Sequence, residues 1–126
     1  MLLIADLFAA IASQSFKYKV DRQIIKVLSN NDRSMRMFIC FYNDIPAACG
    51  LIFYDQYGYA GLHMIGTLPE FRGKGLAHQM TIHLLNECIK DKKMRVVLHA
   101  SEAGERVYLK LGFTPLKQIV TYSLLN

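Results

Sequence analysis

The residues best suited to chemistry lie in one run, Thr67-Leu68-Pro69-Glu70-Phe71-Arg72-Gly73-Lys74-Gly75-Leu76-Ala77. Its two glycines allow a tight turn before a helical pattern, so that several N–H groups can point into one concavity at a helix N-terminus. Such an end carries about half a positive charge, and Arg72 and Lys74 add full charges beside it. The run therefore predicts a phosphate or pyrophosphate site, although an ordinary surface turn can look the same.

Two common phosphate loops do not fit this run. The Walker pattern requires Ser or Thr after Gly-Lys, but Lys74 is followed by Gly75. The dinucleotide fingerprint requires a small third residue, and its place falls on His78. The strand before the loop also belongs to an antiparallel meander, which is not the setting of that fingerprint.

The elements that must position the loop follow from hydrophobic periodicity and turn residues. Helices are predicted over residues 3–13, 21–28, 75–90 and 103–111, and strands over residues 35–42, 47–54, 60–68, 95–100 and 117–124. A hairpin turn is expected at residues 43–46. In the longest helix, the predicted buried stripe is Ala77, Met80, Leu84 and Cys88, widened by Leu85 and Ile89. This order predicts a mixed α/β (α+β) fold in one domain, residues 1–126.

Composition narrows the class of protein. The 126 residues are 52% hydrophobic and 20% charged, which is typical of one globular domain, and the net charge of +5 favours an anionic partner. Cys40, Cys49 and Cys88 have no metal-site spacing and lie in apolar surroundings, so we expect buried reduced thiols in the cytoplasm and no metal. The apolar start lacks a preceding basic residue and contains Asp6, which favours an amphipathic helix over a secretory signal. No run approaches the roughly 20 apolar residues of a transmembrane helix, so no membrane partner is expected.

The run at residues 72–77 indicates a particular family when it is considered together with the C-terminal third of the chain. Arg72-Gly73-Lys74-Gly75-Leu76-Ala77 resembles the Arg/Gln-x-x-Gly-x-Gly/Ala signature of the GNAT superfamily of N-acetyltransferases. Residues 98–113 resemble the strand–helix–strand end of that family, in which a tyrosine stands four residues before a Gly-Phe pair. The resemblance covers about residues 36–122. It implies a mixed, mostly antiparallel sheet flanked by helices, with a splayed central strand pair.

The resemblance also implies acetyl-CoA as co-substrate. In the family, the strand before the loop bonds pantetheine and the loop holds the pyrophosphate. The matching residues here are Ile65, Gly66, Thr67, Arg72, Gly73, Lys74, Gly75, Leu76, Ala77 and Ser101. A backbone N–H near Ile65 or Gly66 would stabilise the oxyanion. Gly66 alternatively marks a β-bulge, Ser101 alternatively caps the next helix, and Lys110 either reaches the adenosine phosphates or is solvated.

Tyr108 matches the general acid of the family, although the same residue could simply pack its helix onto the sheet. The general base is less evident because Gly61 stands where many members have a glutamate. His63 has the strand parity of Gly61, Ile65 and Thr67, which predicts one shared face, and its unperturbed pKa of about 6.5 suits a base. A packed strand histidine is the competing interpretation, and Glu70, His99 or a water chain are other candidates for the base.

The expected function is acetyl transfer to the amine of a small-molecule or peptide acceptor that the sequence does not identify. A non-catalytic acyl-CoA-binding module is the alternative, because the glutamate and the first strand of the family are both missing. An uncovered sheet edge would also favour a homodimer. Lys90, Lys92, Lys93 and Arg95 form a basic run, but no nucleic-acid-binding motif accompanies it, so no nucleic acid is expected.

Overall fold

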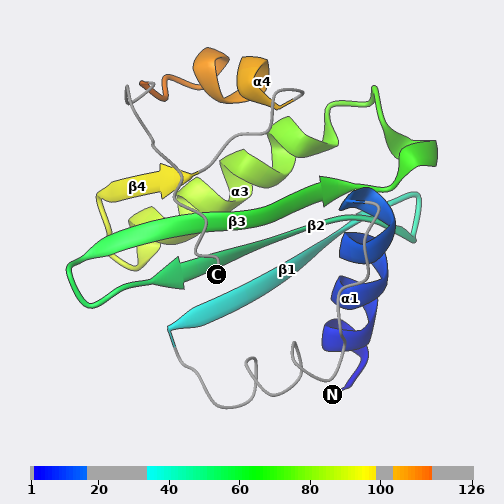
Figure 1. Cartoon of the computed structure of the whole chain (residues 1–126), viewed down its shortest axis with the longest axis horizontal. Coiled ribbons are helices and arrows are strands. Elements are labelled where there is room, and N and C mark those ends of the chain that lie inside the picture. The colour runs from blue at the N-terminus through cyan, green and yellow to red at the C-terminus, as the bar shows by residue number, and fades with distance from the viewer. Residues whose placement is uncertain (1, 17–33, 99–103, 115–126) are drawn as a thin grey trace, which may run out of the picture.

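The computed structural model describes residues 2–16, 34–98 and 104–114. The elements along the chain are α1 (Leu2–Phe16), β1 (Met35–Tyr42), β2 (Ile45–Tyr54), β3 (Tyr59–Thr67), the 3-10 helix η1 (Pro69–Phe71), α3 (Leu76–Lys90), β4 (Arg95–Leu98) and α4 (Glu105–Lys110) (Figure 1). Each predicted helix and strand within these residues is present, with its ends shifted by a few residues at most. The helix and the strand expected at residues 21–28 and 117–124 lie outside the described residues.

The four described strands form one sheet in the order β1-β2-β3-β4. The first three strands are antiparallel neighbours, whereas β4 is parallel to β3 and follows the α3 crossover. The β1–β2 turn is tighter than predicted, because only Asn43 and Asp44 separate the paired ends Tyr42 and Ile45. Both turn residues have left-handed φ values, 50° and 67°, which Asn and Asp tolerate and which match the twist of a two-residue hairpin.

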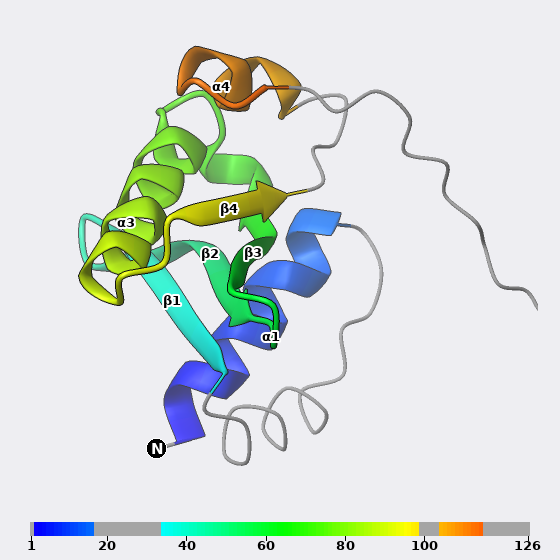
Figure 2. The same ribbon diagram turned by 90° about the vertical axis from the view of Figure 1, so that its left-hand side faces the viewer.

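Helices cover both faces of this sheet, with α1 on one side and α3 on the other (Figure 2). Along β2, Leu51 packs in the cluster of α1 with Phe8, whereas Ile52 packs in the cluster of α3 with Leu84. Because both faces are covered, the strand is buried continuously over residues 47–52. Cys49 and Cys88 are buried free thiols as predicted, while Cys40 is only half-buried.

The face of α3 that packs on the sheet differs from the predicted stripe. Its buried residues are Leu76, Met80, Thr81, Leu84, Glu87 and Cys88. Ile89, which was expected to widen the stripe, is 58% exposed, so that part of the prediction is wrong. Gly50 lies beneath this face, where an added Cβ would come within 3.0 Å of Met80 Cγ and 3.2 Å of Leu84 Cδ1. The missing side chain therefore allows α3 to approach β2 closely.

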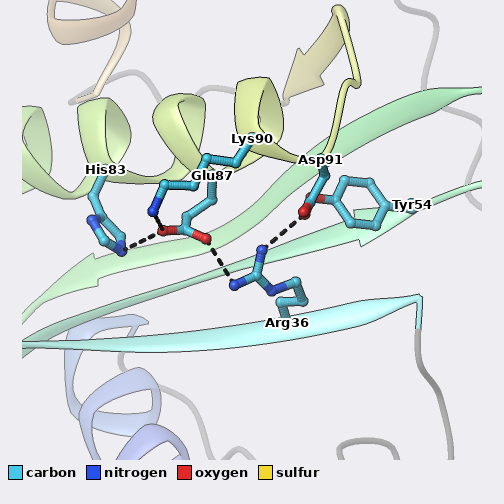
Figure 3. Close-up of polar contacts among 6 residues, drawn as sticks. All are labelled: Arg36, Tyr54, His83, Glu87, Lys90 and Asp91. Atoms are coloured by element: carbon cyan, nitrogen blue, oxygen red, sulfur yellow. Dashed lines mark hydrogen bonds and ion pairs between the residues drawn. The ribbon is translucent and has the colours of Figure 1, made fainter.

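A polar network joins the edge strand β1 to the C-terminal end of α3. It contains Arg36, Tyr54, His83, Glu87, Lys90 and Asp91 (Figure 3). The Arg36 guanidinium donates to Glu87 Oε1 and Asp91 Oδ2, each at 2.8 Å, and the Tyr54 hydroxyl donates to the same Asp91 oxygen. The hydrogen bond from Arg36 lowers the pKa of Glu87, and burial raises that of Tyr54 to about 12. These contacts hold α3 against the sheet at the opposite end of the helix from residues 72–77, which are called the glycine loop below.

Candidate functional site

The glycine loop connects β3 to α3 through η1, and its backbone explains both glycines. Gly73 and Gly75 have left-handed φ values of 79° and 77°. No atom lies within 4 Å of a Cβ added at either one, so backbone conformation and not crowding requires glycine there. Gly75 is the N-cap of α3, and its carbonyl accepts the Gln79 N–H at 3.0 Å. The buried Leu76 anchors the first turn of the helix below the loop.

The loop presents backbone donors to solvent at the positive end of α3. In the described part of the chain, the N–H groups of residues 73–77 donate to no protein acceptor. Residues 73–75 are exposed, and the Lys74 ammonium is held 5.3 Å from the centroid of the Tyr42 ring. A cluster of N–H groups without a protein acceptor, beside one cation, is suited to an anionic, hydrogen-bond-accepting group. The described backbone thus fits the pyrophosphate role expected for this loop.

The Arg72 side chain serves this loop differently from a direct phosphate ligand. Its Nε donates to the Thr67 carbonyl at 3.3 Å, and its Nη2 donates to the Ser15 carbonyl at 3.0 Å. These bonds tie the loop to the end of β3 and to the last turn of α1, where a cation also complements the helix dipole. In this structure the guanidinium braces the loop, and the backbone N–H of Arg72 donates to the Pro69 carbonyl at 3.3 Å.

A β-bulge interrupts β3 before the loop. Cys49 and Leu51, two residues apart on β2, pair with Gly66 and His63, which are three residues apart on β3. The extra residue coincides with Met64, whose φ is 54°, and the Cys49 thiol donates to the Met64 carbonyl at 3.3 Å. The bulge considered at Gly66 therefore lies slightly earlier in the strand. Methionine gives no sequence signal for it, since left-handed backbone is usually marked by Gly, Asn or Asp.

The bulge changes which side chains share a face. His63 pairs with Leu51 of the α1-side cluster, whereas Ile65 packs in the α3-side cluster. Thr67 pairs with Ala48, which packs with Leu76 of α3. The prediction that His63 shares a face with Ile65 and Thr67 is therefore wrong, because strict alternation fails across a bulge.

His63 does share a strand face with Gly61, as predicted. A Cβ built on Gly61 would lie 2.6 Å from His63 Nε2, so the imidazole extends over that residue. Gly61 is buried while His63 is exposed. The position that many members of the resembled family fill with a carboxylate is thus occupied by the neighbouring imidazole.

The predicted pantetheine residues lie where β3 continues beyond its described partner. Pairing with β4 covers Tyr59 to Leu62, and the described part of β4 ends at Leu98. Ile65, Gly66 and Thr67 follow in the next part of β3, which leads directly into the glycine loop (Figure 2). The segment that would face this part of β3 across the predicted splay lies outside the described residues, as do His99 and Ser101.

Tyr108 occupies a helix-end motif that explains its spacing from the Gly-Phe pair. The Phe113 N–H donates to the Tyr108 carbonyl at 3.0 Å, and the Gly112 N–H donates to the Leu109 carbonyl at 3.1 Å. With Gly112 at a φ of 97°, this is a Schellman motif, and the Tyr108 and Phe113 rings make its hydrophobic contact at 6.0 Å between centroids. Tyr108 thus packs against Phe113 of the same helix end, and its role as general acid stays a prediction. Burial also raises the pKa of its phenol, which keeps the proton on the oxygen at neutral pH.

The comparison with protein families decides the identity of this arrangement. Residues 8–121 match the family described as Acetyltransferase (GNAT) domain. The chain belongs to the GNAT acetyltransferase family. The sequence-based recognition is confirmed, and membership supports acetyl transfer with acetyl-CoA as donor. No curated protein matches the chain.

Solved structures confirm the GNAT fold of the chain. It resembles a predicted acetyltransferase with acetyl-CoA from Clostridium acetobutylicum at a TM-score of 0.81 and 20% identity, covering 98% of this chain and 92% of that one. It also resembles glucosamine-6-phosphate N-acetyltransferase from Arabidopsis thaliana at a TM-score of 0.71 and 17% identity, covering 95% of this chain and 93% of that one. The ribosomal-protein-S18-alanine N-acetyltransferase from Escherichia coli matches at a TM-score of 0.74 and 20% identity, covering 90% of this chain and 73% of that one. At these identities the GNAT fold is shared, while the acceptor is not indicated.

No other described feature competes with this site. In the described residues, no group of three side chains could hold a metal ion, and no helix is long and apolar enough to cross a membrane. The basic run at the end of α3 is largely engaged within the protein. Lys90 pairs with Glu87, Lys93 lies over the Tyr54 ring, and Arg95 lies over the Tyr59 ring.

Proposed function

We propose that the protein is a cytoplasmic N-acetyltransferase that moves the acetyl group of acetyl-CoA onto the amine of a small-molecule or peptide acceptor. The observation that carries the proposal is the glycine loop, whose N–H groups at residues 73–77 are available to a pyrophosphate directly after the strand that would bind pantetheine. Lys74 adds charge to this site, Arg72 braces it, and Leu76 fixes the start of α3 below it.

The proposed chemistry is direct attack of the amine nitrogen on the thioester carbonyl carbon. His63 accepts the proton that the acceptor ammonium must lose, and a backbone N–H of Ile65 or Gly66 donates to the carbonyl oxygen as it becomes negative. The carbon–sulfur bond then breaks, and the leaving thiolate takes the phenolic proton of Tyr108. The resulting phenolate takes the second proton from the acylated nitrogen, which leaves a neutral amide and restores the phenol. Burial raises the pKa of the Tyr108 phenol, so the proton that this step requires is present on its oxygen at neutral pH.

Acetyl-CoA binding tests the loop. Calorimetry on the wild type should show binding, which Gly73→Asp should abolish by placing a carboxylate among the phosphate donors. Lys74→Ala should weaken binding, whereas Lys92→Ala removes an equal charge at the other end of α3 and should leave it unchanged. Absence of binding to the wild type, or equal losses from Lys74→Ala and Lys92→Ala, would contradict the proposed site.

Thiol release tests turnover and the choice of acceptor. A panel should contain glucosamine 6-phosphate and a peptide with N-terminal alanine, which represent the acceptors named for two structural neighbours, together with a polyamine. Release with one class would assign the acceptor. Binding without release from any amine would favour a non-catalytic acyl-CoA-binding module, an alternative that the missing carboxylate at Gly61 supports.

A homodimer is proposed through the outer edge of β1. This strand is an edge of the described sheet, and Arg36 is the only charged residue among its eight. Long apolar edges of this kind favour strand pairing. Light scattering should give twice the mass of the chain, and a monomer at high concentration would contradict the proposal.

A further inference from the structure

We propose that Gly61 is a positioning residue for His63, because its missing side chain leaves the space over β3 in which the imidazole lies. This inference rests on the proposed function, in which His63 is the general base. It adds a requirement that the family resemblance does not contain, namely that the residue two positions before the base must lack a side chain.

The crowding at Gly61 comes from one side chain. The three atoms nearest to an added Cβ are all in the His63 ring: Nε2 at 2.6 Å, Cδ2 at 3.3 Å and Cε1 at 3.6 Å. Real Cβ atoms almost never approach another heavy atom within 3.0 Å, so even alanine at position 61 must displace the ring. The displacement itself is easily accommodated, since the ring is the far end of an exposed side chain.

The backbone gives no other reason for glycine at this position. Gly61 lies outside the left-handed region that favours glycine and pairs regularly with Phe53 of β2 and Val97 of β4. Glycine in the interior of a strand costs conformational entropy and contributes no packing. Gly61 weakens the strand, and the backbone geometry does not require it. The space that its missing side chain leaves for the His63 ring is therefore the reason for a glycine at this position.

The location of the pair connects it to catalysis. His63 pairs with Leu51, and the left-handed Met64 follows immediately, so His63 is the last residue of the regular ladder before the bulge. The imidazole therefore starts from the point where β3 diverges from regular pairing on its way to the cofactor loop. Gly61 leaves room for the ring at that point.

A double-mutant cycle tests the inference. Turnover by the full-length protein is measured for the wild type, Gly61→Ala, His63→Ala and the double variant, with the best amine of the panel. Gly61→Ala should lower kcat on the order of ten- to a hundredfold while KM for acetyl-CoA stays unchanged, because a base out of position loses its contribution to the chemical step alone. In the His63→Ala background the same substitution should change kcat less than about twofold, since two residues that act as one unit are strongly coupled.

Two controls keep the outcomes distinct. Gly58→Ala makes the same change in the β2–β3 turn, at a φ of 88°, and should leave kcat unchanged. The imidazole NMR signals of His63, assigned with His63→Ala, should move in Gly61→Ala while those of His83 do not. This readout requires no turnover.

The inference is overturned if Gly61→Ala lowers kcat equally with and without His63, or if the His63 signals do not move. If His63→Ala retains full kcat while Tyr108→Phe is inactive, the acetyltransferase proposal survives and the inference fails. If acetyl-CoA binds but no amine reacts, the proposed enzymatic function fails, and the NMR shift alone decides whether Gly61 orients the ring.

Discussion

The close approach of α3 to β2 at Gly50 can be tested by adding one methyl group. In Gly50→Ala, the new Cβ would lie 3.0 Å from Met80 Cγ, 3.2 Å from Leu84 Cδ1 and 3.3 Å from Met80 Sδ. Met80 is 3% exposed and Leu84 is fully buried, so both side chains are enclosed by the core. The methyl group must therefore either distort these rotamers or lift the helix from the sheet.

The expected cost follows from two opposing effects. Overpacking a buried core costs about 1–3 kcal/mol, and replacing glycine by alanine recovers about 0.4–1 kcal/mol through the unfolded chain. We expect Gly50→Ala to lower the free energy of unfolding by roughly 1–2 kcal/mol, toward the lower end because methionine is flexible. Met80→Ala removes two of the three close atoms, at its own cost of about 2–5 kcal/mol. In that background Gly50→Ala should cost roughly nothing, so the coupling is on the order of 1–2 kcal/mol.

Urea denaturation of the four proteins measures this coupling. Acetyl-CoA affinity provides a functional readout, because α3 begins at the phosphate loop. Affinity should fall in Gly50→Ala if the helix is lifted, and part of that loss should return in the double variant. Equal costs of Gly50→Ala in both backgrounds would refute the reasoning, since the methyl group would then not be opposed by Met80.

Three further predictions concern single residues. Tyr108→Phe keeps the ring packed against Phe113, so stability and acetyl-CoA affinity should persist while kcat falls roughly a hundredfold or more; full activity in a thiol-release assay would exclude the phenol as acid. The hydrogen bond from Arg36 holds the pKa of Glu87 below its ordinary 4.5, so the stability that this carboxylate contributes is present above 4.5 and is lost as pH falls through the folded pKa. Urea titrations should therefore show a smaller loss of unfolding free energy on acidification in Glu87→Gln than in the wild type, and identical pH profiles would contradict this. Gly112→Ala, at a φ of 97°, should cost about 1 kcal/mol, and Gly112→Asn should cost less in the same thermal melts.

Local patterns predicted most of the fold because the physics behind them is local. β1 begins and ends at the predicted residues, since its apolar run is bounded by turn-forming residues on both sides. The glycine loop and the start of α3 were predicted from Gly73 and Gly75, which occupy left-handed backbone as such glycines should. The spacing of Tyr108 from Gly112 and Phe113 is likewise a short-range signal, because the Schellman motif closes within six residues.

Contacts between distant segments gave no comparable signal. Arg36 bonds Glu87 and Asp91 across 51 and 55 residues, and nothing near any of the three indicates the others. The brace from Arg72 to Ser15 spans 57 residues in the same way, so a charge expected to contact phosphate is found on helix carbonyls. Such pairs depend on which strand edge and helix end the fold brings together, and this is known only once the sheet order is known.

The bulge in β3 shows how one unpredicted residue changes the meaning of a pattern. Alternation along a strand predicts faces only while the register is regular, and Met64 shifts it by one residue between His63 and Gly66. Upstream of the shift, odd-numbered residues face α1, so that His63 lies over Gly61 on the side away from α3. Downstream, Ile65 faces α3 and joins the core. The bulge thereby separates His63 on the α1 side from Ile65 and Thr67 on the α3 side, whereas uninterrupted alternation would place all three residues on one face.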